Sequence, residues 1–418
     1  MSAASLLVWF VAALGHAALC VHAANWMQST RFRGWWLKSL RRGVHLLNVG
    51  LPFLLLWYWP GLISRLGAWL ELPMAVQVYV AFVLLVGGFY VPTMLVRRWG
   101  RRPPAHLRSA TSVILRPGAP LPERAYGPAK RAWLARLPGN EIFEVEVAQC
   151  EVTLPRLPPA WDGLTLLHVS DLHFLGVPNR VWFEAVMDYL GRVRADLVLI
   201  TGDIVDSPRH YHWIRPLLGR LRWRLGAFAV LGNHDSYLDV DLIQSELRAT
   251  QIEPIGGQWR TLEHRGASLT FFGNELPWLR PAPDLGRCPR GDFRLCLSHS
   301  PDQLDWARRH EVDLMLCGHN HGGQFRVPGI GSIFVPSRYS GRHDQGLYWE
   351  PPTLLHVSRG LAGTYPIRWR CRPEATWLTL RAAQLHDDAA RAEQLVQMSP
   401  PALTVPLQPR LADDVAQL

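Results

Sequence analysis

Six short runs of apolar residues in the second half of the chain predict buried β-strands. Each run is rich in Leu and β-branched residues and ends at Gly, Asp, Asn or His, as buried strands often do. The runs occupy residues 164–170, 195–201, 227–231, 268–272, 293–298 and 312–317. This pattern predicts an α/β fold with an open sheet. Ligands of such sheets bind beyond the carboxyl ends of the strands, so the residues that follow each run are candidates for a site.

Most of these runs are followed by side chains that can bind a metal. The candidate ligands are Asp171, His173, Asp203, Asn233, His299, His319 and His321. Imidazole, carboxylate and amide without thiolate suit divalent Mn, Fe or Zn. Seven ligands exceed what one tetrahedral ion uses, so we expect two ions that share one carboxylate. Asp203 is alone at its strand end and is the natural bridge. Two such ions can activate water and clamp phosphoryl oxygens.

The first 96 residues have a different hydrophobic pattern. Three uncharged apolar stretches, 6–24, 44–63 and 74–96, each approach the ~20 residues that span a bilayer. The second contains Pro52 and Pro60 and could be kinked or re-entrant. We expect a transmembrane region of about three helices over residues 1–96. A cleaved signal peptide is the weaker interpretation, because no basic segment precedes the first stretch.

Basic residues between the stretches predict the orientation in the membrane. The first connection carries Arg31, Arg33, Lys38, Arg41 and Arg42, and four arginines follow the third stretch. Positive loops stay in the cytoplasm, so we expect a multi-pass protein of the inner (cytoplasmic) membrane with a cytoplasmic catalytic domain.

Two further segments are expected to lie outside the catalytic domain. Residues 97–140 are rich in Arg and Pro and are expected to form a basic juxtamembrane linker, either on anionic lipid or solvated. Residues 381–418 are expected to form a polar tail with a short helix.

Composition narrows the classes of partner. The net charge is +10, and Lys38 and Lys130 are the only lysines. This balance favours nucleic acid, lipid head groups or phosphorylated substrates, without choosing among them. The six cysteines show no paired spacing, which indicates reduced thiols and excludes a disulfide framework or a zinc knuckle.

The order of the polar blocks resembles that of a known family. Asp171-x-His173, Gly202-Asp203, Gly232-Asn233-His234-Asp235, His299 and Gly318-His319-x-His321 follow the signature of the calcineurin-like metallophosphoesterases. The segments SHSPD, GHNHGGQ and VSRGLAG are similar to its membrane-associated bacterial branch, which includes UDP-2,3-diacylglucosamine pyrophosphatase-type enzymes of lipid A biosynthesis. The resemblance covers about residues 150–380. It implies a β-sandwich flanked by helices, in α-β-β-α layers, within a domain at 141–380.

The resemblance also implies roles for single residues. Asp171, His173 and His321 would hold one ion; Asn233, His299 and His319 would hold the other, with Asp203 bridging. His234 would face the substrate and act on its phosphoryl group or leaving oxygen, and Asp206 would orient it and keep it cationic. Protein phosphatases of this superfamily carry Arg-Gly after that acid. Here Ser207-Pro208 stand there, which disfavours a phosphoprotein substrate.

Together these features predict a membrane-anchored two-metal phosphohydrolase. The expected substrate is a phosphate or pyrophosphate ester on a lipid-linked molecule, with UDP-2,3-diacylglucosamine the most concrete candidate. One alternative is a nuclease or cyclic-nucleotide phosphodiesterase; nucleic acid is not expected as a partner, because the arginines do not gather on one element. A catalytically inactive membrane scaffold is the alternative from another class, and the intact ligand set argues against it.

Several residues have two interpretations from sequence alone. His168 lies inside a strand run, which favours a buried and satisfied side chain. Asn274 and Glu275 could contact substrate or form a turn. His210 and His212 could touch a phosphate or be solvated. The three arginines after the last metal block could bind a diphosphate or lie on the surface; they are Arg338, Arg342 and Arg359.

Overall fold

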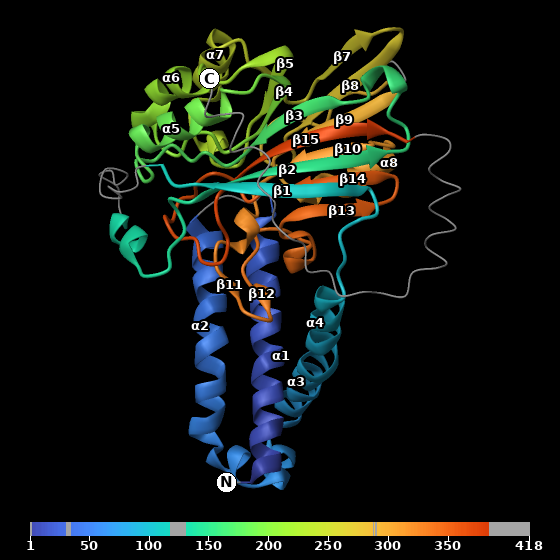
Figure 1. Ribbon diagram of the computed structural model, residues 1–418. Coiled ribbons are helices and arrows are strands. Elements are labelled where there is room, and N and C mark those ends of the chain that lie inside the picture. Colours follow the sequence, from blue (N-terminus) through green and yellow to red (C-terminus); the bar gives the residue numbers. More distant parts are fainter. Residues whose placement is uncertain (1, 31–34, 118–130, 287, 289–290, 384–418) are drawn as a thin grey trace.

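The protein has a long helical bundle below a domain of two large sheets, as the computed structural model shows in Figure 1. The structure describes residues 2–30, 35–117, 131–286, 288 and 291–383. The expected tail lies outside the described residues from position 384 onward, as do Arg31 and Arg33 of the first connection.

The first sheet has seven strands and contains both early and late parts of the chain. Its spatial order is β1 (Leu107–Leu115), β2 (Val145–Leu154), β15 (Glu374–Ala382), β3 (Leu164–Val169), β4 (Ala195–Thr201), β5 (Trp223–Val230) and β6 (Glu253–Pro254). Strands β3 to β6 are parallel. Strand β15 pairs parallel to β2 and antiparallel to β3, so the last described strand is central in the sheet.

The second sheet has six strands. Its order is β13 (Gly346–Glu350), β14 (Thr353–Val357), β10 (Leu314–Cys317), β9 (Phe293–Ser298), β8 (Ala267–Asn274) and β7 (Trp259–His264). Strands β8, β9, β10 and β14 are parallel. A small hairpin of β11 (Arg326–Val327) and β12 (Gly331–Ser332) lies beside the bundle (Figure 1).

The two sheets pack face to face and helices cover their outer faces. Leu166, Leu199, Phe271 and Leu316 belong to one apolar cluster that draws on both sheets, and the rings of Phe228 and Phe271 stack 4.8 Å apart. The outer face of the seven-stranded sheet packs against α5 (Arg180–Leu190), α6 (Ile214–Leu218) and α7 (Val240–Ala249). Helix α8 (Leu304–Arg309) covers the other sheet. The mixed α/β class is therefore confirmed.

The strand pattern by itself indicated one open sheet, but the six predicted strands divide equally between two sheets, as the β-sandwich implied by the family resemblance requires. Buried parallel strands are apolar on both faces, so their pattern does not tell which strand is the neighbour. The stretch 97–140 is likewise more than a linker, since β1 pairs antiparallel with β2 from Leu107 to Leu115. Most residues of β1 are exposed, and polar residues interrupt its apolar ones, which hid the strand. Residues 118–130 of that stretch lie outside the described residues.

The helical part consists of α1 (Ala3–Gln28), α2 (Trp35–Tyr58), α3 (Met74–Leu85) and α4 (Val91–Trp99). A π-helical turn, Val86–Tyr90, joins α3 and α4 into one 26-residue helix. By length and composition, Ala3–Gln28 and Met74–Trp99 could each cross a membrane. The middle predicted span lies largely in α2, which contains Pro52. Helix α2 is not one of the two described helices that are long and apolar enough to cross a membrane.

Close contact between α1 and the Met74–Trp99 helix depends on two glycines. A Cβ on Gly15 would lie 1.9 Å from the Val83 carbonyl oxygen, and one on Gly87 would lie 2.1 Å from that of Val11. Small residues of this kind let helix backbones approach in apolar surroundings. His16 of α1 contacts the hydroxyl of Tyr79 and the Leu47 carbonyl oxygen, so it serves helix packing as expected.

Short 3-10 segments lie between the longer helices and strands. The described ones are Pro60–Ile63, Leu66–Glu71, Ala132–Arg136, Pro159–Trp161, Pro208–Trp213, Asp235–Tyr237, Pro301–Gln303, His321–Gly323 and Ser340–His343. Ser300 caps one of them by accepting a hydrogen bond from the Asp302 N–H, as its position before Pro301 predicts.

The central place of β15 gives a stability prediction. Leu378 is fully buried between the sheets, so Leu378→Ala should lower the free energy of unfolding by about 2–5 kcal/mol. Equilibrium denaturation in detergent would measure this. Leu225 is 44% exposed, and Leu225→Ala should change stability by only about 0.5 kcal/mol. Equal effects of the two changes would contradict the assignment of β15 to the core.

Candidate metal centre

The seven predicted ligands meet where the parallel strands of both sheets end. Asp171 and His173 follow β3, Asp203 follows β4 and Asn233 follows β5. From the other sheet, His299 follows β9, and His319 and His321 follow β10. Backbone hydrogen bonds join these loops directly: the Asp171 N–H donates to the Gly202 carbonyl oxygen, and the Gly318 N–H donates to that of His299.

One cluster is formed by Asp171, His173 and His321, whose donor atoms all lie within 4.8 Å of one another. Asp171 Oδ1 is 3.8 Å from His173 Nε2 and 3.6 Å from His321 Nε2. The side chains of Asp171 and His173 are fully buried. Two imidazole nitrogens and a carboxylate oxygen therefore face a common point.

A second cluster is formed by Asp203, His299 and His319, again within 4.8 Å. The amide oxygen of Asn233 and His319 Nδ1 each lie 3.1 Å from His299 Nε2. This brings all four residues around one point and completes the set expected for a second ion.

The carboxylate of Asp203 lies between the two clusters. Its Oδ2 is 3.5 Å from His173 Nε2 of the first cluster and 3.1 Å from His299 Nε2 of the second. Its Oδ1 accepts a hydrogen bond from the His234 N–H at 2.8 Å, which fixes the rotation of the carboxylate. This is the position that a bridging ligand requires.

The far sides of three imidazole rings are held by hydrogen-bonding partners. His173 Nδ1 is 2.7 Å from Asp206 Oδ1, and His299 Nδ1 is 2.7 Å from the Thr201 carbonyl oxygen. Arg368 donates to His321 Nδ1 at 3.3 Å. Such partners fix ring orientation in metal sites and leave the opposite nitrogen free for the ion.

His234 is the candidate catalytic residue and lies at the open side of the clusters. Its side chain is 32% exposed, whereas Asp206 is nearly buried. Asp206 Oδ1 is 2.9 Å from His234 Nδ1, and Asp206 Oδ2 accepts a hydrogen bond from Thr364. Asp206 thus contacts both His234 and the ligand His173, a double role that the sequence did not predict.

The electrostatics of the centre favour a cation. Burial works against ionisation, but His299 and His234 hold the pKa of Asp203 well below its usual range. Burial also opposes protonation of His299, yet Asp203 raises its pKa to about 9. Burial and the charge of His299 lower the pKa of His319 to about 3. Protons on imidazoles therefore balance the buried carboxylates.

Divalent cations fit this donor set, because their positive charge would replace the imidazole protons in neutralising the buried carboxylates. The buried Nε2 atom of His173, which faces both Asp171 and Asp203, has no hydrogen-bond partner among the described residues. Unpartnered buried nitrogens beside carboxylates are costly in themselves and suit metal ligation.

The backbone around the ligands is strained. Positive φ angles occur at five of the seven candidates, Asp171, His173, Asp203, His319 and His321. Such angles cost about 1–3 kcal/mol each at residues other than Gly and collect at functional sites. Two glycines permit the close packing: a Cβ on Gly318 would lie 2.0 Å from Asp171 Oδ2, and one on Gly232 would lie 2.1 Å from Asp203 Oδ1.

Other residues weighed from the sequence have structural contacts. His168 is buried against His356 and Thr201, as expected. Asn274 accepts the Leu276 N–H, which supports the turn interpretation for that residue. Glu275 accepts the Leu231 N–H and so joins the ends of β8 and β5. Burial raises the pKa of Glu275 to about 7.

The remaining candidates are paired or lie in loops. Asp235 accepts the N–H groups of Ile204, Val205 and Gly232 and so ties the loops after β4 and β5 together. Arg338, Arg342 and Arg359 form ion pairs with Asp305, Glu350 and Glu374, respectively. His210 and His212 lie in the 3-10 segment Pro208–Trp213. All six cysteines are free, as predicted.

Sequence reasoning missed three residues that support the ligands. Thr201, Thr364 and Arg368 contact His299, Asp206 and His321, respectively. Thr201 directly precedes the Gly202-Asp203 block, whereas Thr364 and Arg368 lie outside every ligand block. The side chain of Arg368 is fully buried, which is unusual for an arginine. This burial is a property of the fold and left no signal in the sequence pattern.

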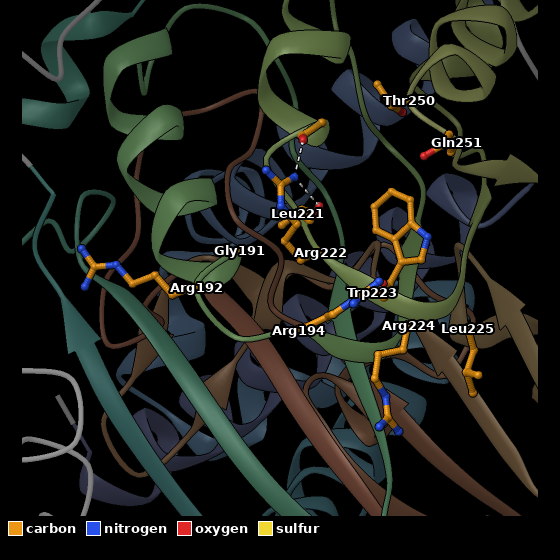
Figure 2. Close-up of a pocket in the computed structure, with 11 residues that line it drawn as sticks. Gly191, Arg192, Arg194, Leu221, Arg222, Trp223, Arg224, Leu225, Thr250 and Gln251 are labelled. Carbon is orange, nitrogen blue, oxygen red and sulfur yellow. Dashed lines mark hydrogen bonds between the residues drawn. The ribbon is translucent and has the colours of Figure 1, made fainter. Parts of the chain in front are cut away.

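A cavity of about 470 Å³ lies elsewhere, at the amino ends of β4 and β5. Figure 2 shows that its arginines point in different directions. Arg222 donates to the carbonyl oxygens of Gly219 and Leu221, and Arg224 pairs with Asp196. The side chains do not converge on a common point, so this cavity is not the functional site.

Buried carboxylates and imidazoles that surround two neighbouring points define a metal-dependent hydrolase centre. The family model for calcineurin-like phosphoesterase matches residues 164–323, which include all seven ligands. The chain belongs to this family, and it is a metal-dependent phosphoester hydrolase. Members of the family use divalent metals.

Similar proteins include both bacterial and animal chains. Phosphodiesterase YaeI of Escherichia coli is 31% identical over 51% of this chain and 81% of its own length. The uncharacterized metallophosphoesterase YkuE of Bacillus subtilis is 28% identical over 58% and 87%. The transmembrane protein with metallophosphoesterase domain of Bos taurus is 27% identical over 57% of each chain.

The position of Asp203 gives a test of metal binding. Asp203→Asn keeps the size and shape of the side chain but removes the shared negative charge, so bound metal and turnover should both fall by at least tenfold. Elemental analysis of the purified protein after Mn loading would measure the metal. Asp196→Asn alters a carboxylate at the opposite strand end and is the matched control. Full metal content in Asp203→Asn would contradict the bridging role.

The partly exposed imidazole of His234 gives a separate test, which concerns its assigned catalytic role. His234→Ala should retain bound metal and lose about 10²–10⁴-fold in rate, since it removes a proton donor and no ligand. Metal content and phosphodiester turnover measured on the same sample would check this. Release of metal by His234→Ala would show that the assigned role is wrong.

Proposed function

We propose that this protein is a membrane-anchored hydrolase that uses two divalent ions to cleave a phosphate or pyrophosphate ester of a lipid-linked substrate. The observation that carries the two-ion part is the Asp203 carboxylate, which faces both ligand clusters. Mn, Fe and Zn all suit the donor set.

Each residue has a task in the proposed reaction. Bound divalent ions at such a pair of sites acidify water and neutralise phosphoryl oxygens. The seven ligands hold them in buried surroundings that strengthen every charge interaction. Asp206 holds His234 through Nδ1, which leaves Nε2 directed away from Asp206.

His234 can therefore give a proton to the leaving oxygen. Burial lowers its pKa, but Asp203 and Asp206 outweigh that and raise the pKa of His234 above its usual range. This shift favours the protonated imidazole, which is the form that a general acid requires.

Membrane anchoring is supported by the two long apolar helices and their contacts with the catalytic domain. Arg98, in the last turn of the Met74–Trp99 helix, pairs with the buried Asp344. Asp344 also pairs with Arg326, which donates to the Gly322 carbonyl oxygen in the loop of His321. The helices are thereby connected to the metal loop. The transmembrane relative from Bos taurus is consistent with this arrangement.

The proposed orientation in the membrane depends on the distribution of basic residues, and the proposed substrate depends on resemblance to related enzymes. The basic residues favour a multi-pass arrangement in the inner membrane with the catalytic domain in the cytoplasm. UDP-2,3-diacylglucosamine is the most concrete substrate, through resemblance to enzymes of lipid A biosynthesis. The name of phosphodiesterase YaeI favours a diester over a monoester.

A substrate panel would test the proposal. Mn-loaded full-length protein in detergent should hydrolyse lipid diphosphates and lipid phosphodiesters faster than phosphomonoesters, nucleic acid or cyclic nucleotides. Asp203→Asn is the inactive control. Faster cleavage of nucleic acid or cyclic nucleotides would replace the lipid substrate by the nuclease or phosphodiesterase alternative. Bound metal without turnover of any ester would favour a scaffold.

A further inference from the structure

Five exposed apolar side chains lie beside the metal loop. They are Phe325, Ile330, Phe334, Tyr365 and Trp369, which are 39%, 41%, 47%, 45% and 47% exposed, and we call them the apolar ledge. Large apolar side chains gathered next to a site usually mark an interaction surface. The catalytic assignment above uses none of them.

The ledge is continuous with the loop that carries His321. Phe325 follows that loop directly, and its ring packs edge to face on Trp369 with the centroids 4.6 Å apart. The Trp369 N–H donates to the Gln324 carbonyl oxygen at 2.8 Å. Trp369 also follows Arg368, whose guanidinium contacts His321. Trp369 is therefore next in sequence to Arg368, which contacts the candidate ligand His321, and Phe325 packs on Trp369.

The other members are attached to the same loop. A Cβ on Gly323 would lie 3.2 Å from the Phe334 carbonyl oxygen, so Phe334 borders the loop backbone. A Cβ on Gly363 would lie 3.7 Å from both His321 Cε1 and the Tyr365 carbonyl oxygen. Tyr365 is thus close to a metal ligand as well.

The opposite side of the ledge meets three helices of the bundle. Asn25 of α1 donates to the Ile333 carbonyl oxygen and accepts the Val335 N–H. The ring of His45 in α2 lies 5.9 Å from that of Phe334. Trp99, the last residue of the Met74–Trp99 helix, donates through its indole N–H to the Gly329 carbonyl oxygen. Figure 1 shows the β11–β12 hairpin at this junction, beside the upper part of the bundle.

This position fixes the depth of the ledge if the helices span the bilayer. Tryptophan at the end of an apolar helix sits at the membrane–water interface. Ile330 follows the residue that Trp99 contacts, so the ledge begins at the level of the lipid head groups. The exposed Arg131 lies over the Tyr365 ring at 4.4 Å, and the exposed Arg370 follows Trp369. Arginines beside exposed aromatic rings suit an anionic lipid surface.

We propose that the apolar ledge contacts the bilayer and receives the hydrocarbon part of a lipid substrate, whose phosphate then reaches the metal centre without leaving the membrane surface. This inference rests on the proposed function, because it names the surface by which that site takes a lipid. It commits to lipid as the occupant, since the ledge adjoins the helices near Ile330 and Phe334 and the metal loop through Phe325 and Trp369.

The test compares two substrates with the same leaving group. Full-length protein in anionic phospholipid vesicles would be given bis-p-nitrophenyl phosphate, which is soluble, and a diacylglycerol p-nitrophenyl phosphodiester, which is membrane-borne. The variant Phe325→Ser/Trp369→Ser should lower the ratio of lipid to soluble turnover at least tenfold. Phe325→Leu/Trp369→Phe keeps apolar surface and should retain the ratio.

A matched control uses apolar side chains at the other end of the domain. Val193 and Leu225 are 58% and 44% exposed near the amino ends of β4 and β5, and Val193→Ser/Leu225→Ser should leave the ratio unchanged. An unchanged ratio in the ledge variant would overturn the inference. So would an equal loss on both substrates, which would mean that the ledge only supports the metal loop. A fall in molecular mass of the detergent-solubilised variant would identify the ledge as a contact between two copies and overturn it too.

The wild-type protein separates this inference from the proposed function. Turnover of the soluble diester without turnover of the lipid diester would refute the lipid substrate itself. Turnover of neither would refute hydrolysis of diesters. Turnover of both, with the ratio unaffected by the ledge variant, would refute the ledge alone.

Discussion

The arrangement of this protein depends on one buried carboxylate. Asp203 faces ligands from both sheets, with one oxygen 3.5 Å from His173 and 3.1 Å from His299. The chain must therefore bring the ends of β3, β4, β5, β9 and β10 to a single edge. The face-to-face packing of the two sheets, the positive φ angles and the glycines beside the carboxylates all serve that convergence. Their cost in strain is compatible with stability only because the surrounding core is large and fully packed.

Charge balance connects this core to the chemistry. Buried carboxylates are costly unless a positive charge compensates them. Imidazoles, the guanidinium of Arg368 and the divalent ions of the family can all provide such charge. Asp206 belongs to this network and also holds His234, so the candidate acid and the first ligand cluster are oriented by the same side chain. A change in either imidazole would be transmitted to the other through one carboxylate.

The helical bundle is attached at the same end of the domain as the metal loop. The contacts from Asn25, Arg98 and Trp99 all go to the segment 329–344, which follows the loop of His319 and His321 in sequence. A site near the helix ends would suit the proposed substrates, which are held at a membrane surface. The role proposed for the apolar ledge would give such substrates a specific route from lipid to metal.

The sequence by itself determined the ligand types, their order, the apolar stretches and the α/β class, because each is written in short-range patterns of a few residues. It also gave the positions of the six strands, since burial on both faces leaves a continuous apolar run. The strand pattern did not show that these strands divide between two sheets, which only the family resemblance implied. Only the tertiary structure decided that β1 and β15 join one of them, and that Arg368 and Thr364 support the site. The reason is physical: periodicity reports how deeply a residue is buried, whereas pairing and contact across hundreds of residues depend on the packing of the whole chain.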